Sequence, residues 1–204
     1  MKITAILLSC AAMAALSATA SAAVMTYTQT ATLSGSLDGT SFTDAAVTIR
    51  MTADTANVQY DVYAGILPLW INAGVATIDI DGFETATLIG PSYFGVLAVD
   101  YSAYSPFGLV GFADLTNFLP LVSIVQTSEL NYGLATEATF TGSFANEGGA
   151  TSYQGPFSTT LGDLVLSSGG SGTTTFTAAV PEPSALALLG LGTVGLVARR
   201  RRVA

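Results

Sequence analysis

Two aspartates separated by one residue form the most chemistry-like pattern in the chain. The stretch "ATIDIDGFE" places Asp79 and Asp81 directly before Gly82, which matches positions 3, 5 and 6 of a calcium-binding EF-hand loop. Positions 1 and 12 of that loop are then Thr77 and Leu88, so the carboxylate cage is incomplete. The pattern favours a strand that ends in an Asp-Gly turn. Asp79 and Asp81 remain weak candidates for a cation site, and we expect no metal or other cofactor.

Histidine is absent from the chain, and the only lysine and the only cysteine lie within residues 1–22. The rest of the chain therefore excludes a Ser-His-Asp triad, a Cys-His pair, a Ser-Lys dyad, a Schiff-base lysine and a His-ligated zinc site. Carboxylate pairs remain, since Asp79 with Asp81, or Asp61 with Glu84, can share a sheet face. Glycoside hydrolysis needs two carboxyls at a fixed separation. No aromatic-rich cleft sequence surrounds these pairs, so we expect a protein that is not an enzyme and keep a carboxylate-only glycoside hydrolase as the second alternative.

The segment 23–180 is strongly acidic. It contains every acidic residue of the chain except Glu182, and Arg50 is its only basic side chain. A surface of this sign repels phosphate backbones, so we expect no nucleic-acid partner.

Aromatic residues offer a route to a sugar ligand. Trp70 lies in "AGILPLWINAG", between two expected strands, where an exposed loop indole can stack on a sugar ring. An indole folded over the end of the core is the commoner arrangement, so Trp70 is a weak candidate ligand residue. The middle of the chain offers a second possible platform for a ligand, but its apolar pattern favours burial of these aromatic side chains in the core (Tyr93, Phe94, Tyr101, Tyr104, Phe107 and Phe112). A carbohydrate-binding module is the first alternative function.

The elements that would position these residues are strands. Apolar and polar residues alternate with a period of two in segments 47–53, 58–62, 76–81 and 138–144, and threonine occupies every second position from Thr26 to Thr32, a pattern typical of half-buried strands. Asp-Gly dipeptides and the Gly-rich "SSGGSG" read as connections, while the apolar stretch 93–115 suits strands buried on both faces. We expect an all-β fold, an antiparallel β-sandwich or jelly-roll-like single domain over residues 23–179.

The first 22 residues have the organisation of a secretory signal peptide. Lys2 precedes an apolar segment, and Ala20-Ser21-Ala22 is a small-residue cleavage pattern, so we expect cleavage after Ala22, with Ala20 as the second choice, and the secretion machinery as a partner. Leu7-Leu8-Ser9-Cys10 resembles a lipoprotein lipobox, but too few residues precede Cys10 for a charged and an apolar region. The mature protein would then contain no cysteine, and core burial would have to hold it together.

Residues 180–204 combine a stiff turn, an apolar segment and a basic cluster. Val180-Pro181-Glu182-Pro183 precedes the apolar run 185–198, and Arg199, Arg200, Arg201 and Arg202 follow it. As a helix the run is about 21 Å long at 1.5 Å per residue, shorter than a hydrocarbon core of about 30 Å. We expect a marginal, temporary transmembrane helix whose arginines act as a cytoplasmic stop.

These three parts resemble, in order, the PEP-CTERM sorting signal of Gram-negative bacteria. The resemblance covers about the last 25 residues. It implies recognition at Pro-Glu-Pro by an exosortase, a membrane-embedded processing enzyme, and delivery to the cell surface or the exopolysaccharide matrix. We therefore expect an exported, non-enzymatic surface or biofilm-matrix protein that is anchored transiently in the inner membrane, with exopolysaccharide as a further partner. The resemblance implies nothing about the chemistry of residues 23–179.

Overall fold

A computed structural model describes residues 24–63, 67–89, 94–100, 108–115, 119–126, 132–143, 150–152 and 155–181. Apart from the short 3₁₀ turn η1 (Thr55–Asn57), all regular elements in these ranges are strands, and every pairing between them is antiparallel. This confirms the prediction of an all-β, antiparallel fold.

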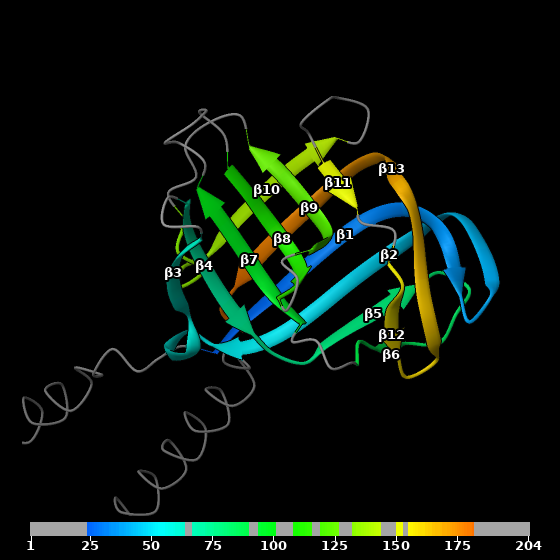
Figure 1. Ribbon diagram of the computed structural model, residues 1–204, viewed down its shortest axis with the longest axis horizontal. Coiled ribbons are helices and arrows are strands. Elements are labelled where there is room, and N and C mark those ends of the chain that lie inside the picture. The colour runs from blue at the N-terminus through cyan, green and yellow to red at the C-terminus, as the bar shows by residue number, and fades with distance from the viewer. Residues whose placement is uncertain are drawn as a thin grey trace, which may run out of the picture.

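The strands form two sheets (Figure 1). The first sheet has the order β10 (Ala138–Ser143), β13 (Gly162–Ala179), β1 (Val24–Leu37), β2 (Thr40–Asp54), β5 (Ala76–Ile80) and β6 (Ala86–Thr87), and β12 (Phe157–Thr159) also pairs with β13. The second sheet has the order β11 (Ala150–Ser152), β9 (Leu119–Gln126), β8 (Gly108–Asp114), β7 (Phe94–Asp100), β4 (Leu67–Ala73) and β3 (Gln59–Tyr63). Strands β7, β8 and β9 form a meander, so this order does not show a jelly roll.

The hairpin between β1 and β2 follows from its turn residues. Asp38 and Gly39 both have positive φ, 49° and 77°, which is the requirement of a type I′ turn. This turn matches the right-handed twist of its strands, and it sets the pairing of Leu37 with Thr40. The Asp-Gly prediction is confirmed here.

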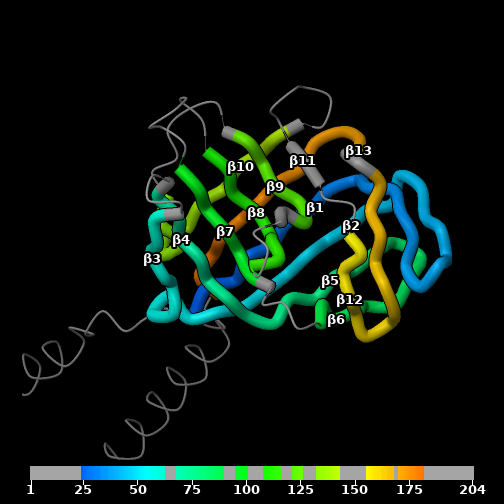
Figure 2. The backbone as a smooth tube through the Cα atoms, in the orientation of Figure 1, coloured from blue at the N-terminus to red at the C-terminus, as the bar shows by residue number. Residues whose placement is uncertain are grey.

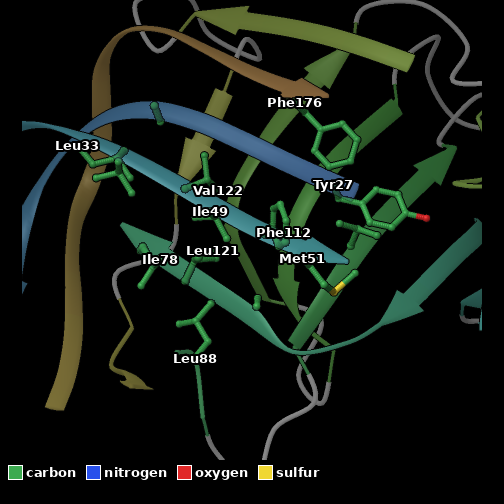
Figure 3. Packing of buried hydrophobic residues seen from close by; sticks show 14 of the residues in the cluster. Tyr27, Leu33, Ile49, Met51, Ile78, Leu88, Phe112, Leu121, Val122 and Phe176 are labelled. Carbon is green, nitrogen blue, oxygen red and sulfur yellow. The ribbon is translucent and has the colours of Figure 1, made fainter. Parts of the chain in front are cut away.

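Alternation along the strands builds one core that the two sheets share (Figure 3). On β2, Val47, Ile49 and Met51 are buried while Arg50 and Thr52 are exposed. The second sheet contributes Phe112 of β8 and its neighbours on β7 and β9 to the same cluster. The predicted alternation of apolar and polar residues therefore identifies correctly which face of the first sheet is buried.

The second sheet is apolar on both faces. Val96 and Ala98 of β7 belong to the shared core, whereas Leu97 and Val99, on the opposite face of the same strand, form a second buried cluster with Leu69 and Ala113. The prediction of strands buried on both faces in this stretch is confirmed for β7 and β8.

Two expectations about strands were wrong. "SSGGSG" is no connection, because residues 167–172 lie inside β13, whose long curved course is visible in Figure 2. The pairing of β13 with β1 shifts register between Thr30 and Thr32 and again between Leu33 and Gly35, so the small residues allow bulges rather than a turn. Strand β3 does not bury Tyr60 and Val62, which are 60% and 38% exposed, because β3 is an edge strand of the second sheet.

Candidate functional site

An aromatic pair lies at the β3 edge of the second sheet. Trp70 was expected in a loop but belongs to β4, directly opposite Tyr60 of β3. The two ring centroids are 5.4 Å apart and the ring planes are inclined by 54°. Trp70 is half-buried and packs against the shared core, whereas Tyr60 is exposed. The pair thus joins a structural indole to an accessible phenol ring.

Gly133 borders the indole of Trp70. A Cβ at this position would lie 3.4 Å from Nε1 and 3.5 Å from Cδ1, so Gly133 packs beside the nitrogen edge of the ring. The exposed ring of Tyr60 is of the kind that can stack on the C–H groups of a sugar.

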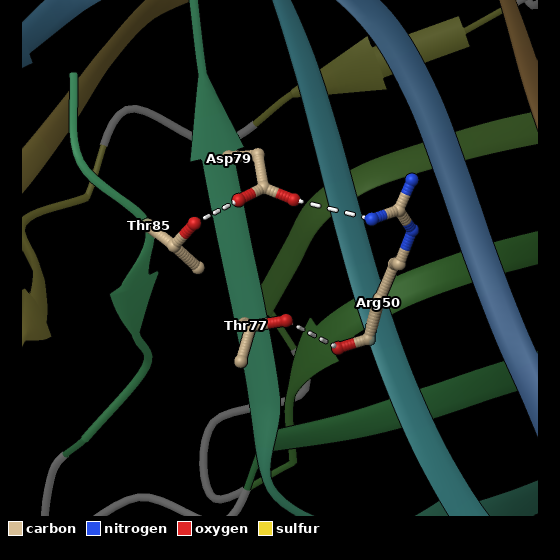
Figure 4. A network of polar contacts seen from close by, with 4 residues as sticks. All are labelled: Arg50, Thr77, Asp79 and Thr85. Carbon is tan, nitrogen blue, oxygen red and sulfur yellow. Dashed lines mark hydrogen bonds and ion pairs between the residues drawn. The ribbon is translucent and has the colours of Figure 1, made fainter.

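Asp79, one of the two aspartates singled out by their spacing, lies on the outer side of the first sheet (Figure 4). Asp79 Oδ2 is 3.4 Å from Arg50 Nη1, and Asp79 Oδ1 accepts a hydrogen bond from Thr85 Oγ1. The ion pair is exposed, 58% at the arginine and 39% at the aspartate, so it contributes about 0–1 kcal/mol. Both carboxylate oxygens of Asp79 are thus already engaged by donors.

The other candidate carboxylates do not converge either. Asp81 occupies the turn after β5, where its backbone N–H donates to the Ala46 carbonyl. Asp61 lies on β3 of the second sheet, whereas Glu84 follows β5 of the first sheet, so the expected shared sheet face for this pair is wrong. Among the described residues no group of three or more His, Cys, Asp or Glu side chains is placed to hold a metal ion.

A buried polar cluster that the sequence did not reveal links the two sheets. Tyr27 Oη of β1 donates to the Leu134 carbonyl at 2.6 Å and accepts from Asn72 Nδ2 of β4 at 3.0 Å. The second Nδ2 proton of Asn72 goes to the Asp54 carbonyl at 3.2 Å. Asn72 Oδ1 has no partner in the described part of the chain. Because the Tyr27 hydroxyl proton is already donated to Leu134, the atom of Asn72 that faces Tyr27 must be the donor Nδ2, and this fixes the orientation of the amide.

Burial governs the ionisation of two tyrosines beside this cluster. It raises the pKa of Tyr27 above its ordinary value, and the hydrogen bond from Asn72 partly opposes the shift. Burial also raises the pKa of Tyr132, and the charge of an ionised Tyr27 would raise it further. Both phenols are therefore neutral at physiological pH and act as hydrogen-bonding groups rather than as bases.

A second buried link runs through Gln29 of β1. Its Oε1 accepts the backbone N–H of Phe112 at 3.3 Å, at the point where the β8–β9 register shifts. Its Nε2 donates to Thr174 Oγ1 at 3.3 Å, and that hydroxyl donates to the Thr30 carbonyl at 2.8 Å. The glutamine thus supplies the partner for an N–H group of the opposite sheet.

The last described residues belong to the expected sorting segment. Strand β13 ends at Ala179, and the N–H of Val180 donates to Glu137 Oε1 at 3.1 Å. Pro181 has no N–H group, so the ladder cannot extend through it. The remaining candidate residues lie outside the described ranges: Ala20, Ala22, Glu182, Pro183, the segment 185–198 and Arg199 to Arg202. Within the described part of the chain, no helix has the length and apolar character to cross a membrane.

Comparison with known proteins identifies this segment. Residues 179–202 match the family model described as the PEP-CTERM protein-sorting motif. No curated protein and no solved structure matches the chain. The match confirms the resemblance seen in Val180 to Pro183 and the residues that follow. The chain carries a PEP-CTERM protein-sorting motif, which implies an exported protein that is anchored transiently at the membrane and recognised by an exosortase, a membrane processing enzyme.

Proposed function

We propose that this protein is a non-enzymatic β-sandwich protein of the bacterial surface or biofilm matrix, delivered by exosortase processing. The signal peptide 1–22 directs export and is removed. The segment 185–198 then holds the chain in the inner membrane, with Arg199 to Arg202 on the cytoplasmic side, until the exosortase releases it toward the surface and its exopolysaccharide. The single observation that carries the proposal is the sorting-motif match at residues 179–202.

The described side chains agree with a non-enzymatic role. Asp79 is held by Arg50 and Thr85, and Asp61 and Glu84 belong to different sheets. The acidic, hydroxyl-rich outer strands suit a soluble exterior. Tyr27 accepts a hydrogen bond from Asn72, and Gln29 accepts one from the Phe112 N–H, so both side chains join the two sheets, which is a structural use of buried polar groups.

Glu182→Ala tests the sorting proposal. Export and folding should persist because the change lies outside the described sheets, but the full-length protein should accumulate in the inner membrane because the enzyme no longer recognises the motif. Replacement of Arg199 to Arg202 by serine should instead let the short apolar segment slip through the membrane, since it loses its cytoplasmic stop. Cell fractionation and mass spectrometry of the C-terminal peptide separate these outcomes. A Glu182→Ala protein that reaches the surface with the wild-type processed terminus would contradict the proposal.

A second candidate function is carbohydrate binding at the Tyr60–Trp70 pair. The observation that favours it is the exposed Tyr60 ring, whose centroid lies 5.4 Å from that of the Trp70 indole. Stacking of a neutral sugar on Tyr60 needs no charge, so it is compatible with the acidic exterior.

Tyr60→Ala separates binding from stability. Because Tyr60 is mostly exposed, we expect a change in unfolding free energy within about 1 kcal/mol, together with a clear loss of retention on the exopolysaccharide of the producing cells. Val62→Ala on the same edge strand is the matched control and should keep full retention. Equal retention of wild type and Tyr60→Ala would leave the pair with a structural role only.

A further inference from the structure

The sorting motif starts at the end of a strand from the middle of the first sheet. Strand β13 lies between β10 and β1, with Ala178 opposite Ala138 on one side and Ala179 opposite Thr26 on the other. The motif match begins at Ala179, the last residue of β13. No linker therefore separates the folded sheet from the motif.

Residues just before the motif are not accessible as a free chain. Phe176 and Ala178 are buried at 0% and 1% exposure, and Phe176 contacts the rings of Tyr27, Phe112 and Phe140. An enzyme that binds an extended stretch upstream of Val180 would have to pull β13 away from both neighbouring strands and expose this core. Removing a strand from the middle of a sheet breaks ladder bonds on two sides, unlike fraying at an edge.

The first motif residue outside the strand is held as well. The Val180 N–H is bound by the Glu137 carboxylate, and Val180 is 40% exposed. Pro181 is exposed and cannot extend the ladder. The accessible chain thus begins at Val180 and Pro181.

We propose that the processing enzyme reads the chain only from Val180 onward and acts while β13 remains paired up to Ala179. This proposal rests on the proposed exosortase processing and adds to it the upstream limit of recognition. The enzyme must then accept the folded sheet directly at the edge of its binding site, and no residue before Val180 contributes to its specificity.

A disulfide at the end of β13 tests this limit. In a Cys10→Ala background, which removes the chain's single native cysteine, Thr26→Cys and Ala179→Cys are combined. These positions are opposite each other in an antiparallel pair and share the outer face, with Cβ atoms about 4.5–5.5 Å apart, which is close to the separation a disulfide needs. The oxidised bond pins Ala179 to β1, and dithiothreitol releases it.

The purified full-length chain is incubated with exosortase-containing membranes, and the C-terminal peptide is identified by mass spectrometry. We expect the oxidised and reduced forms to be processed at rates within about twofold of each other and at the same bond. An oxidised form that stays full-length and is processed after reduction would overturn the proposal, because the enzyme would then need to detach Ala179.

Two further variants keep the result unambiguous. The pair Thr28→Cys with Thr177→Cys places the same bond deeper in the same strands and controls for the disulfide itself. Insertion of Gly-Ser-Gly-Ser between Ala179 and Val180 supplies a free upstream chain, and we expect an unchanged rate. An increase in rate above about fivefold would show that the sheet had been limiting access and would also overturn the proposal.

Wild type and Glu182→Ala are incubated in parallel. An unprocessed wild type would contradict the proposed function. If wild type is processed but the oxidised Thr26→Cys, Ala179→Cys variant is not, only the upstream limit is contradicted.

Discussion

Replacing Gln29 by methionine tests whether a buried amide joins the two sheets. Gln29 is 1% exposed, and its Oε1 is the acceptor for the Phe112 N–H while its Nε2 contacts Thr174. Methionine has a similar length and volume, so it removes both polar atoms with little change in packing. The variant therefore isolates the hydrogen bonds from the shape of the side chain.

The expected cost comes from one orphaned donor. Without Gln29 the Phe112 N–H stays buried and unpaired, which costs about 1–3 kcal/mol. Thr174 keeps its own bond to the Thr30 carbonyl, so it adds no second penalty. We expect Gln29→Met to lower the free energy of unfolding by about 1–3 kcal/mol. Combined with Thr174→Val it should cost less than the sum of the single changes, because the two side chains belong to one network.

Urea unfolding at neutral pH measures this difference through the midpoint, with the slope as a check on two-state behaviour. Gln59→Met on the exposed edge strand β3 is the matched control and should stay within about 0.5 kcal/mol of wild type. If Gln29→Met has the same midpoint as the Gln59→Met control, Gln29 does not stabilise the contact between the sheets and the reasoning fails.

Three further predictions concern packing, pH and metal. Gly111→Ala should destabilise the protein by at least about 1–3 kcal/mol, because the added Cβ would collide with the Val122 carbonyl and lie 2.7 Å from Ser123 Cα. Gly133→Ala is the control: its nearest contact would be at 3.4 Å, so calorimetry should give a melting temperature within about 2 °C of wild type. Burial raises the folded-state pKa of Tyr27 and Tyr132. Their contribution to stability is therefore fully present below the unfolded-state pKa of about 10 and is lost as pH rises toward the folded-state values. We expect the melting temperature to fall above about pH 10, and to fall less steeply in the Tyr132→Phe variant. EDTA should leave the melting temperature unchanged, and a large drop would revive a cation site at Asp79 and Asp81.

Local sequence was sufficient where the physical cause is local. The alternation at 47–53 and 76–80 identified the buried face of β2 and β5, because side chains on a strand point to opposite sides in turn. Asp38-Gly39 predicted its hairpin because few other residues adopt two consecutive positive φ angles at low cost. The sorting motif was readable for a related reason: Val180 to Pro183 and the residues after them form a continuous signal in the chain itself, and the family match to 179–202 confirms it.

The rest depended on which strands become neighbours. Tyr60 has the alternation of an inward residue, yet it is exposed because the fold leaves β3 at an edge. Gln29 and Asn72 are polar residues whose buried bonds exist only because β1 faces β8 and β4 across the core. The glycines of "SSGGSG" read as a connection, but pairing with β1 keeps them within β13.

The sequence by itself determined that strands would form, which of their faces would be apolar, and that residues 179–202 would carry a sorting motif, since each of these follows from residues close together in the chain. Only the tertiary structure decided that the motif begins at the end of an interior strand. Thr26 and Ala179 are distant in sequence, and their pairing is selected by the burial of Tyr27, Phe112 and Phe176 in one core. That burial is a property of the assembled sheets, and no local pattern encodes it.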